Sequence, residues 1–300
     1  MRGLLAALAV VAQVTAGSPA QAGSFTSGVH EGRAYRLYVP ATAASTLVIA
    51  LHGCWQTPDD FARGTRLNEA ADRRGLVIVY PAQGRAAHPY RCWNWYEAGS
   101  HTAARGETAE ILALARHIAS EHGLGDRRAV VLGFSAGGFM AVNLVCAAPS
   151  LVSGVGVLAG GAYRCGVGAE GAIQCMRGRG GDGAAAAQAC LDVTGARTLP
   201  VRASLWQGAV DRVVNAANLS ALETMFARAV GMVSSATESQ PGAVTSVHRD
   251  GRGRPVVETW LIRNMGHAWS GGDPRGRHTY PAGPRATDRM LDFLLGPAPR

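Results

Sequence analysis

Short apolar runs and amphipathic stretches alternate along the chain. Uncharged runs such as "TLVIAL" and "LVIVY" predict strands buried on both faces. The strands expected from such runs cover residues 34–39, 46–51, 76–80, 129–132, 155–158, 201–206 and 257–262. Apolar residues at helical spacing predict helices over residues 59–73, 107–122, 136–148, 217–229 and 285–295. This alternation is typical of an α/β fold, with a mostly parallel sheet covered by helices on both faces.

One segment, residues 162–199, departs from this pattern. It is rich in Gly, Ala and Arg and holds three cysteines. A segment of this length is either an insertion that caps a functional site or a long surface excursion, and the sequence favours neither. No repeat, linker or second domain is visible, so we expect residues 23–300 to form one domain.

The first 22 residues have the pattern of a secretory signal peptide. Arg2 is followed by an uncharged, mostly apolar run over residues 3–15, and Ala20-Gln21-Ala22 forms an A-x-A cleavage site. The apolar run is too short for a convincing membrane span, and no later stretch is long enough. The sequence therefore predicts a secreted protein, extracellular or periplasmic, without a membrane span.

The charge of the chain is strongly basic, at +8, and loss of Arg2 with the signal peptide would leave +7. All 29 basic residues are arginine. A dispersed, solvated surface is one interpretation of this bias, and attraction to a polyanionic substrate is the other. Because the arginines are scattered and no binding module is visible, we do not expect nucleic acid as a partner. Nothing in the sequence indicates an oligomeric state.

Six cysteines remain after the signal peptide, an even number for an oxidising compartment. No C-x-x-C or H-E-x-x-H spacing occurs, so we expect disulfides and no metal site. Six cysteines allow fifteen connectivities, and their spacing does not choose among them. They are Cys54, Cys92, Cys146, Cys165, Cys175 and Cys190.

A strand, a tight turn and a helix are predicted around Ser135. The motif Gly133-Phe134-Ser135-Ala136-Gly137 ends the strand and opens the helix. With 39 glycines in 300 residues the G-x-S-x-G spacing decides little alone, and the flanking elements carry the interpretation. A nucleophilic serine needs this setting, because the turn requires small neighbours and the helix start directs the Ala136 N–H at the reacting oxygen.

A serine hydroxyl needs a base to remove its proton and an acid to orient that base. In this type of site the chain order is serine, acid, histidine, each after a strand. Asp211 follows the strand expected to end at residue 206, and His267 follows the strand expected to end near residue 262. Each could be an ordinary turn residue, but the ordered set predicts a catalytic triad of Ser135, Asp211 and His267.

The segment "LHGCWQ" follows the strand predicted at residues 46–51. It matches the strand-end His-Gly loop that supplies an oxyanion N–H in such enzymes. We therefore expect the N–H groups of Cys54 and Ala136 to form the oxyanion hole. His52 precedes the serine in the chain, so we interpret it as a structural residue that orients this loop.

These segments together resemble the polyhydroxybutyrate depolymerase family of secreted esterases. The resemblance extends from about Arg33 to the C-terminus and implies one catalytic domain of the α/β-hydrolase fold, with no cofactor. Its carriers are "LHGCWQ" (51–56), "CWNWY" (92–96), "RGETAEI" (105–111), "GFSAGG" (133–138), "WQGAVDRVV" (206–214) and "NMGHAWSGG" (264–272). Gln207-Gly208 stands where family members often carry His-Gly before the acid.

The resemblance also implies a Cys54–Cys92 disulfide and a set of substrate-binding tryptophans. Of these, Trp93, Trp95 and Trp269 would line an apolar cleft, and ordinary core packing is the alternative for each. Trp55, beside the oxyanion loop, is the fourth.

The expected function is that of a secreted serine esterase acting on polyhydroxyalkanoate, such as poly(3-hydroxybutyrate), or its oligomers. Polymer-degrading members commonly append a polymer-binding domain, whereas this sequence stops after a helix near Leu295, so oligomers or small esters are favoured. A feruloyl- or acetylxylan-type carbohydrate esterase is an alternative on the same scaffold. The arginine surplus suggests another, an amide hydrolase of an anionic polymer such as poly(aspartic acid). A non-catalytic binding protein on a hydrolase scaffold is the alternative from a different class.

Overall fold

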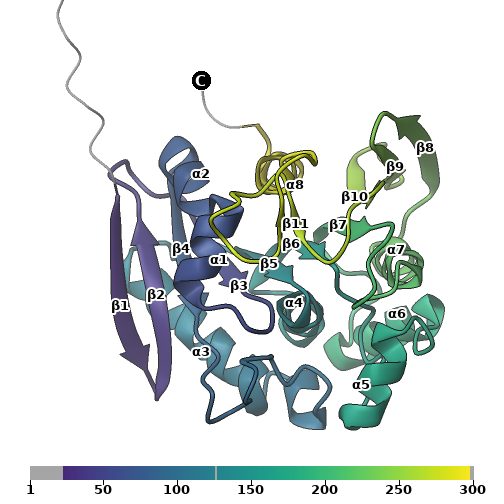
Figure 1. Cartoon of the computed structure of the whole chain (residues 1–300). Helices are drawn as coiled ribbons and strands as arrows, with labels where there is room; N and C mark the ends of the chain where they lie inside the picture. Colours follow the sequence, from purple (N-terminus) through teal and green to yellow (C-terminus); the bar gives the residue numbers. More distant parts are fainter. Residues whose placement is uncertain (1–22, 126, 298–300) are drawn as a thin grey trace, which may run out of the picture.

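A ten-stranded sheet forms the centre of the computed structural model, which describes residues 23–125 and 127–297 (Figure 1). The strand order is β1-β2-β4-β3-β5-β6-β7-β10-β9-β8. The signal peptide expected at residues 1–22 lies outside the described residues. The strands are β1 (Ser24–His30), β2 (Arg33–Val39), β3 (Thr46–Leu51), β4 (Leu76–Pro81), β5 (Ala129–Phe134), β6 (Val152–Leu158), β7 (Arg202–Gly208), β8 (Ser234–Gln240), β9 (Ala243–Arg249) and β10 (Pro255–Ile262).

The six central strands, from β4 to β10 in the sheet order, pair in parallel. Antiparallel strands complete the sheet at both edges. Every residue of β4 and β5 is buried, as expected for uncharged strands covered on both faces. Since parallel strands point the same way, the loops that follow β3, β5, β7 and β10 all lie at the same end of the sheet, where these strands have their C-terminal ends.

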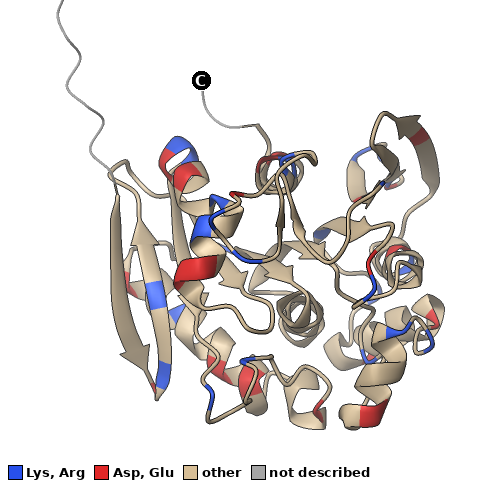
Figure 2. Ribbon diagram, in the orientation of Figure 1, with Lys and Arg blue, Asp and Glu red and all other residues tan. Residues whose placement is uncertain are grey.

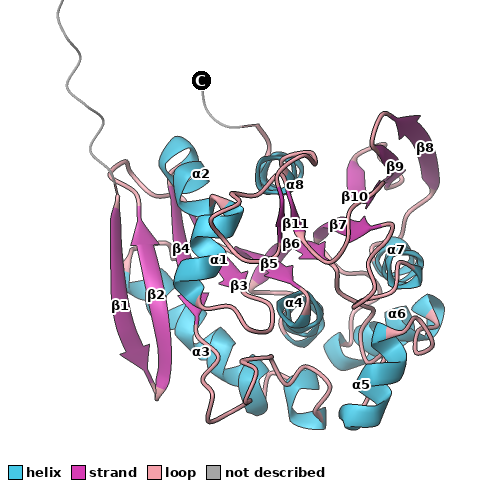
Figure 3. Cartoon of the chain, viewed as in Figure 1, coloured by secondary structure: helices cyan, strands magenta, loops and turns pink. Residues whose placement is uncertain are grey.

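Helices cover both faces of the sheet (Figure 3). Helices α1, α2 and α8 pack on one face of the sheet, and α3, α4 and α7 pack on the other. The helices are α1 (Pro58–Thr65), α2 (Leu67–Arg74), α3 (Gly106–Glu121), α4 (Ala136–Ala147), α5 (Gly168–Met176), α6 (Gly183–Thr194), α7 (Ala217–Ala229) and α8 (Ala286–Leu295), with a short 3₁₀ helix η1 (Ala98–His101) before α3.

The single helix predicted over residues 59–73 is wrong, because the structure forms two helices there. The chain turns at Arg66, which adopts a left-handed conformation with φ of 58°. The loop between β11 (Trp269–Ser270) and β12 (Thr279–Tyr280) packs against the end of α1 at this point. A Cβ atom on Gly276 would lie 2.3 Å from the Cα atom of Gly64, so this loop lies directly against the end of α1.

Strand β2 agrees with the strand predicted over residues 34–39, but its hairpin partner β1 and both strands of the β8–β9 hairpin were not predicted. The β1–β2 hairpin turns at Glu31 and Gly32, which both have positive φ, at 48° and 82°, a combination typical of two-residue hairpins. Strand β8 is exposed along its whole length. An exposed strand lacks the alternation of apolar and polar residues by which strands are predicted.

The segment over residues 162–199 folds into α5 and α6. It contacts the rest of the domain mainly at α7 and α4. Disulfides Cys165–Cys175 and Cys146–Cys190 fix it, the second by joining α6 to α4. Together with Cys54–Cys92, these disulfides include all six cysteines. Complete pairing of cysteines is typical of proteins from oxidising compartments.

Charged residues are distributed over the helices and loops rather than gathered at one place in the view of Figure 2. Many arginines form ion pairs with carboxylates, among them Arg73 and Arg285, which both contact Asp288. Within residues 23–125 and 127–297, no helix has the length and apolar character needed to cross a bilayer.

Candidate active site

Ser135 occupies a sharp turn between β5 and α4. Its φ of 55° and ψ of −124° are unusual for a residue with a side chain, and such backbone strain is concentrated at functional sites. Two glycines make the turn possible. A Cβ atom on Gly133 would lie 2.1 Å from the carbonyl oxygen of Gly137, and one on Gly137 would lie 2.2 Å from that of Leu51. The strand and helix backbones are therefore too close for larger residues, as a nucleophile elbow requires.

The sheet topology places Asp211 and His267 beside this turn. Asp211 comes three residues after the end of β7, and His267 comes five residues after the end of β10. These two strands pair in parallel with each other, and β6 separates β7 from β5. The loops that follow them therefore extend toward the elbow.

The three side chains form a continuous chain of hydrogen bonds. The Nε2 atom of His267 lies 2.9 Å from Ser135 Oγ, and its Nδ1 atom lies 2.8 Å from Asp211 Oδ2. Because an ionised carboxylate only accepts, Nδ1 carries the proton and Nε2 is free to accept one. Ser135 is 5% exposed and Asp211 is 7% exposed, so both lie largely out of water. This geometry allows the serine hydroxyl to transfer its proton to His267.

The surroundings of Asp211 keep its carboxylate charged. Its Oδ1 atom accepts the backbone N–H groups of Val213 at 2.8 Å and Val214 at 2.9 Å. Burial alone would raise the pKa of Asp211. The hydrogen bond and charge of His267, followed by the two backbone donors, outweigh burial and hold that pKa below its usual value.

Gln207 is a site residue that the sequence analysis did not identify. Its Nε2 atom donates to Asp211 Oδ2 at 3.0 Å and to the carbonyl of Val214 at 3.0 Å. From the end of β7, this side chain therefore links Asp211 to Val214 and fixes the loop that contains them. Gln207-Gly208 in place of the family's usual His-Gly pair is the one sequence feature that points to this residue, but a sequence alone does not show what its side chain contacts.

Of the two expected oxyanion donors, Ala136 lies at the elbow and Cys54 lies on the loop that packs against it. Helix α4 begins at Ala136, so the positive end of its dipole faces the serine. The close contact of Gly137 with Leu51 brings the loop that follows β3 against this helix start. Within the described residues, neither Cys54 N–H nor Ala136 N–H donates to another protein group. Both donors are thus available for a ligand.

The Cys54–Cys92 disulfide implied by the family resemblance is confirmed. It joins the loop that follows β3 to the segment that follows β4. The two segments are also linked by a hydrogen bond from Trp55 N to the Tyr90 carbonyl oxygen, at 2.7 Å.

The expectation that three tryptophans line an open cleft is wrong. Trp93 and Trp269 are 0% and 2% exposed, and Trp95 stacks on Phe139 within the core. The indole N–H of Trp93 donates to the His52 carbonyl, and that of Trp269 donates to Thr287 Oγ1. An indole satisfied in this way packs as a core residue.

Trp55 differs from the other three, since it is 48% exposed and stacks on exposed Tyr90 with 4.5 Å between ring centroids. This pair lies on the oxyanion-loop side of the site.

A second histidine lies near the triad and had no sequence signal. The ring of His278 is 6.2 Å from that of His267, and Phe134 contacts both rings. Burial and the nearby His267 lower the pKa of His278, so a neutral ring is favoured there. Within the described residues, no group of three or more His, Cys, Asp or Glu side chains is placed to hold a metal ion.

Comparisons with known proteins find esterases, and one family model matches most of the chain. A family model described as "Esterase PHB depolymerase" matches residues 33–248. Poly(3-hydroxyalkanoate) depolymerase C of Paucimonas lemoignei is 30% identical over 234 residues, covering 76% of this chain and 56% of the relative. Feruloyl esterase B of Neurospora crassa is 30% identical over 138 residues, covering 45% of this chain and 46% of the relative. The chain thus spans about half the length of these relatives.

The fold also matches solved structures of esterases. Acetyl xylan esterase from Aspergillus awamori superimposes with a TM-score of 0.73 at 18% identity, covering 82% of this chain and 94% of that chain. The likeness identifies the α/β-hydrolase fold, in agreement with the mostly parallel sheet and its two helical layers. Since the family model spans more than half of the sequence, the chain belongs to the PHB depolymerase family of esterases.

Proposed function

We propose that this protein is a secreted serine esterase that cleaves ester bonds through an acyl-enzyme. One observation carries the proposal, the hydrogen-bonded chain from Ser135 through His267 to Asp211 at the elbow. This chain supports the proposal, because acyl transfer needs a nucleophile, a base and an orienting acid in hydrogen-bond contact.

Ester cleavage would proceed in two halves. His267 Nε2 takes the proton of Ser135 Oγ as that oxygen bonds to the ester carbonyl carbon. The negative charge that forms on the carbonyl oxygen is held by the N–H groups of Cys54 and Ala136. Collapse breaks the bond to the alcohol, which leaves with the proton from His267. Water then repeats the sequence on the acyl-enzyme and releases the acid, with Asp211 stabilising the imidazolium throughout.

The proposed substrates are polyhydroxyalkanoates, such as poly(3-hydroxybutyrate), or their oligomers. Membership of the PHB depolymerase family supports this class, as does the name of the 30% identical Paucimonas lemoignei relative. Three disulfides and the signal-peptide pattern of residues 1–22 support secretion.

A carbohydrate esterase of the feruloyl or acetylxylan type is the second candidate. The exposed stack of Trp55 on Tyr90 favours it, because flat aromatic faces bind planar acids and sugar rings. An amide hydrolase of poly(aspartic acid) has only the arginine surplus in its favour, and in the described part of the chain eight of those arginines are paired with carboxylates.

Ser135→Ala tests the mechanism and separates an enzyme from a binding protein. We expect the wild-type protein to hydrolyse p-nitrophenyl butyrate and to be labelled by a fluorophosphonate. The alanine variant should do neither, while its circular dichroism spectrum stays unchanged because no core volume is lost. Labelling of the variant, or its residual turnover at the wild-type rate, would contradict the proposal. Product analysis on 3-hydroxybutyrate oligomers, feruloyl and acetyl esters and poly(aspartic acid) then assigns the substrate.

A further inference from the structure

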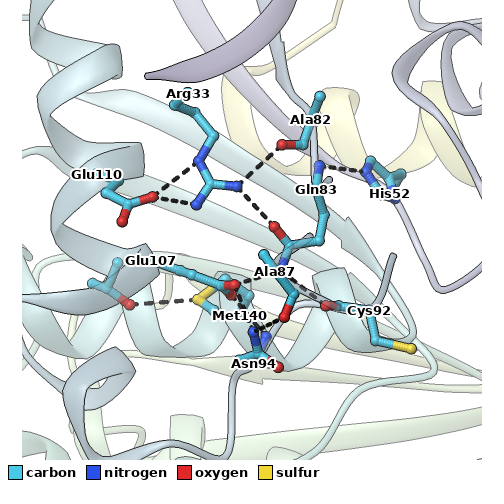
Figure 4. A network of polar contacts seen from close by, with 11 residues as sticks. Arg33, His52, Ala82, Gln83, Ala87, Cys92, Asn94, Glu107, Glu110 and Met140 are labelled. Carbon is cyan, nitrogen blue, oxygen red and sulfur yellow. Dashed lines mark hydrogen bonds and ion pairs between the residues drawn. The ribbon is translucent and has the colours of Figure 1, made fainter. Parts of the chain in front are cut away.

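We infer that a buried polar network of Glu107, Gln83 and His52 positions the oxyanion donor of Cys54, so that these three are positioning residues for ester cleavage. The inference rests on the function proposed above. In the described structure none of the three is hydrogen-bonded to Ser135, whose Oγ pairs with His267, and all are buried, at 7%, 3% and 1% exposure. Figure 4 shows the network that they form with the neighbouring segments.

The contact of His52 with the oxyanion loop is the functional end of this network. His52 Nδ1 lies 2.8 Å from the carbonyl oxygen of Gly53. That carbonyl and the Cys54 N–H belong to one peptide group, which is planar and trans. The N–H therefore points opposite to the carbonyl. By holding the carbonyl, His52 fixes the direction of the N–H that would meet the oxyanion.

The network also fixes the proton of His52. The backbone N–H of Gln83 donates to His52 Nε2 at 3.2 Å, and a backbone nitrogen can only donate. Nε2 is therefore unprotonated, and Nδ1 carries the hydrogen that reaches Gly53. Burial is the main reason that the pKa of His52 is lowered to about 4, which keeps this neutral form at neutral pH.

Gln83 connects His52 to a buried acid. Its Nε2 atom donates to Glu107 and, at 3.0 Å, to the Cys92 carbonyl, while its Oε1 atom accepts from Arg33 at 2.8 Å. Both donors and the acceptor of this amide are thus occupied, so its orientation is fixed.

Glu107 anchors the other side of the disulfide. It accepts the backbone N–H of Asn94 at 2.7 Å and the side-chain amide of Asn94 at 2.9 Å. The network therefore holds Gly53 on one side of the Cys54–Cys92 bond and the segment after Cys92 on the other. Both ends of the disulfide are therefore held in position relative to the start of α3, whose first turn contains Glu107.

Catalysis is sensitive to such positioning, because an oxyanion donor acts only when it lies within hydrogen-bond distance of the developing charge. Loss of a donor costs about 10²–10³ in kcat, and a displaced donor loses part of that. A purely structural network would instead change the melting temperature and leave kcat of the folded protein intact.

The first test compares Glu107→Gln with Glu121→Gln, an exposed residue at the opposite end of the same helix. The amide of Glu107→Gln places a donor against donors of Gln83 or Asn94. With p-nitrophenyl butyrate, we expect Glu107→Gln to lower kcat by about tenfold to a hundredfold with KM changed less than about threefold. Glu121→Gln should keep the wild-type values.

A second pair of variants keeps the test independent of the folding of Glu107→Gln. The His52→Asn amide can still donate to the Gly53 carbonyl, whereas the His52→Gln amide reaches toward Gln83 and leaves that carbonyl free. We expect His52→Asn to retain more kcat, and to be labelled faster by a fluorophosphonate, than His52→Gln.

Equal kcat for Glu107→Gln and Glu121→Gln, or equal losses in the two His52 variants, would overturn the inference. A wild-type protein that neither cleaves esters nor reacts with the fluorophosphonate would instead refute the proposed function.

Discussion

The Asp211 carboxylate accepts hydrogen bonds on both oxygens, and this division predicts the result of replacing it with asparagine. In Asp211→Asn, the oxygen can keep the Val213 and Val214 N–H groups, while the amide nitrogen faces His267. The proton of His267 then moves to Nε2, which can no longer accept from Ser135. We expect kcat to fall about 10⁴-fold with little change in fold, as in other triads.

Asp273→Asn is the matched control, because Asp273 is also buried but pairs with Arg66 and Arg275 rather than with His267. Steady-state kinetics and thermal melts of both variants give the comparison. A near-neutral Asp211→Asn together with an inactive Asp273→Asn would show that the acid is wrongly assigned.

His52 is a buried residue whose charge links folding to pH. Its pKa is lowered to about 4, first by burial and then by Arg91 and Arg33, against the Gly53 hydrogen bond and Asp60. The unfolded chain takes up this proton as pH falls through about 6.5, whereas the folded protein takes it up only near 4. The unfolded state is therefore favoured progressively between these values, by up to about 3 kcal/mol in total.

Replacing His52 is expected to remove this pH dependence from the free energy of unfolding. Urea unfolding of the wild-type protein and of His52→Gln, measured at intervals from pH 4.5 to 7.5, gives the difference in free energy of unfolding. We expect the wild-type advantage to shrink as pH falls below about 6.5. A difference that stays constant over this range would contradict the lowered pKa of His52.

At the scale of elements, the junction of β3, β5 and α4 depends on the absence of a side chain. The three atoms nearest to a Cβ atom on Gly137 would all be backbone atoms, at 2.2 Å for Leu51 O, 2.6 Å for Leu51 C and 2.7 Å for His52 O. Backbone atoms cannot move aside as a side chain can, so the helix start and the oxyanion loop must separate.

Gly137→Ala should therefore lose soluble protein, or at least about 10² in kcat, because a displacement of about 1 Å at the reacting atoms costs this much. Gly138→Ala is the control on the same helix. A Cβ atom there would lie 3.2 Å from Val157 Cγ1 and 3.3 Å from the backbone atoms Gly160 Cα and Leu158 O, so the crowding is far milder than at Gly137. The gain in helix propensity of about 1 kcal/mol offsets it. Expression yield, melting temperature and kcat are compared for the two variants. Equal kcat would show that the close contact at Gly137 is not required for activity.

At the scale of the whole molecule, two disulfides of similar span serve different regions. Cys54–Cys92 and Cys146–Cys190 join residues 38 and 44 positions apart, so chain entropy assigns each about 4 kcal/mol. Only the first adjoins an expected oxyanion donor. The second ties α6 to α4.

We expect replacement of either pair by alanine to lower the melting temperature by a similar amount, on the order of 10 °C. Only Cys54→Ala/Cys92→Ala should also lower kcat markedly, with KM largely retained. Calorimetry and steady-state kinetics on both double variants test this. If Cys146→Ala/Cys190→Ala lost as much kcat, proximity to the oxyanion loop would not be the cause.

The sequence by itself determined the features that depend on neighbouring residues. Strands such as β3 and β5, the turn at Ser135 and the positions of Asp211 and His267 after strands are all encoded by short-range pattern. Burial on both faces requires uncharged runs, and a tight turn requires glycine, so each leaves a local signature. The exposed strand β8 and the break at Arg66 carry no such signature, and they were missed.

Only the tertiary structure decided which distant residues meet. A tryptophan has the same letter in a core as in a cleft, and Trp93 proved to be buried while Trp55 is exposed. The contact of Gln207 with Asp211, and the path from Glu107 to His52, depend on where β4, β7 and α3 lie relative to one another. Hydrogen bonds and disulfides act over a few ångströms in space, and separation along the chain does not specify those distances.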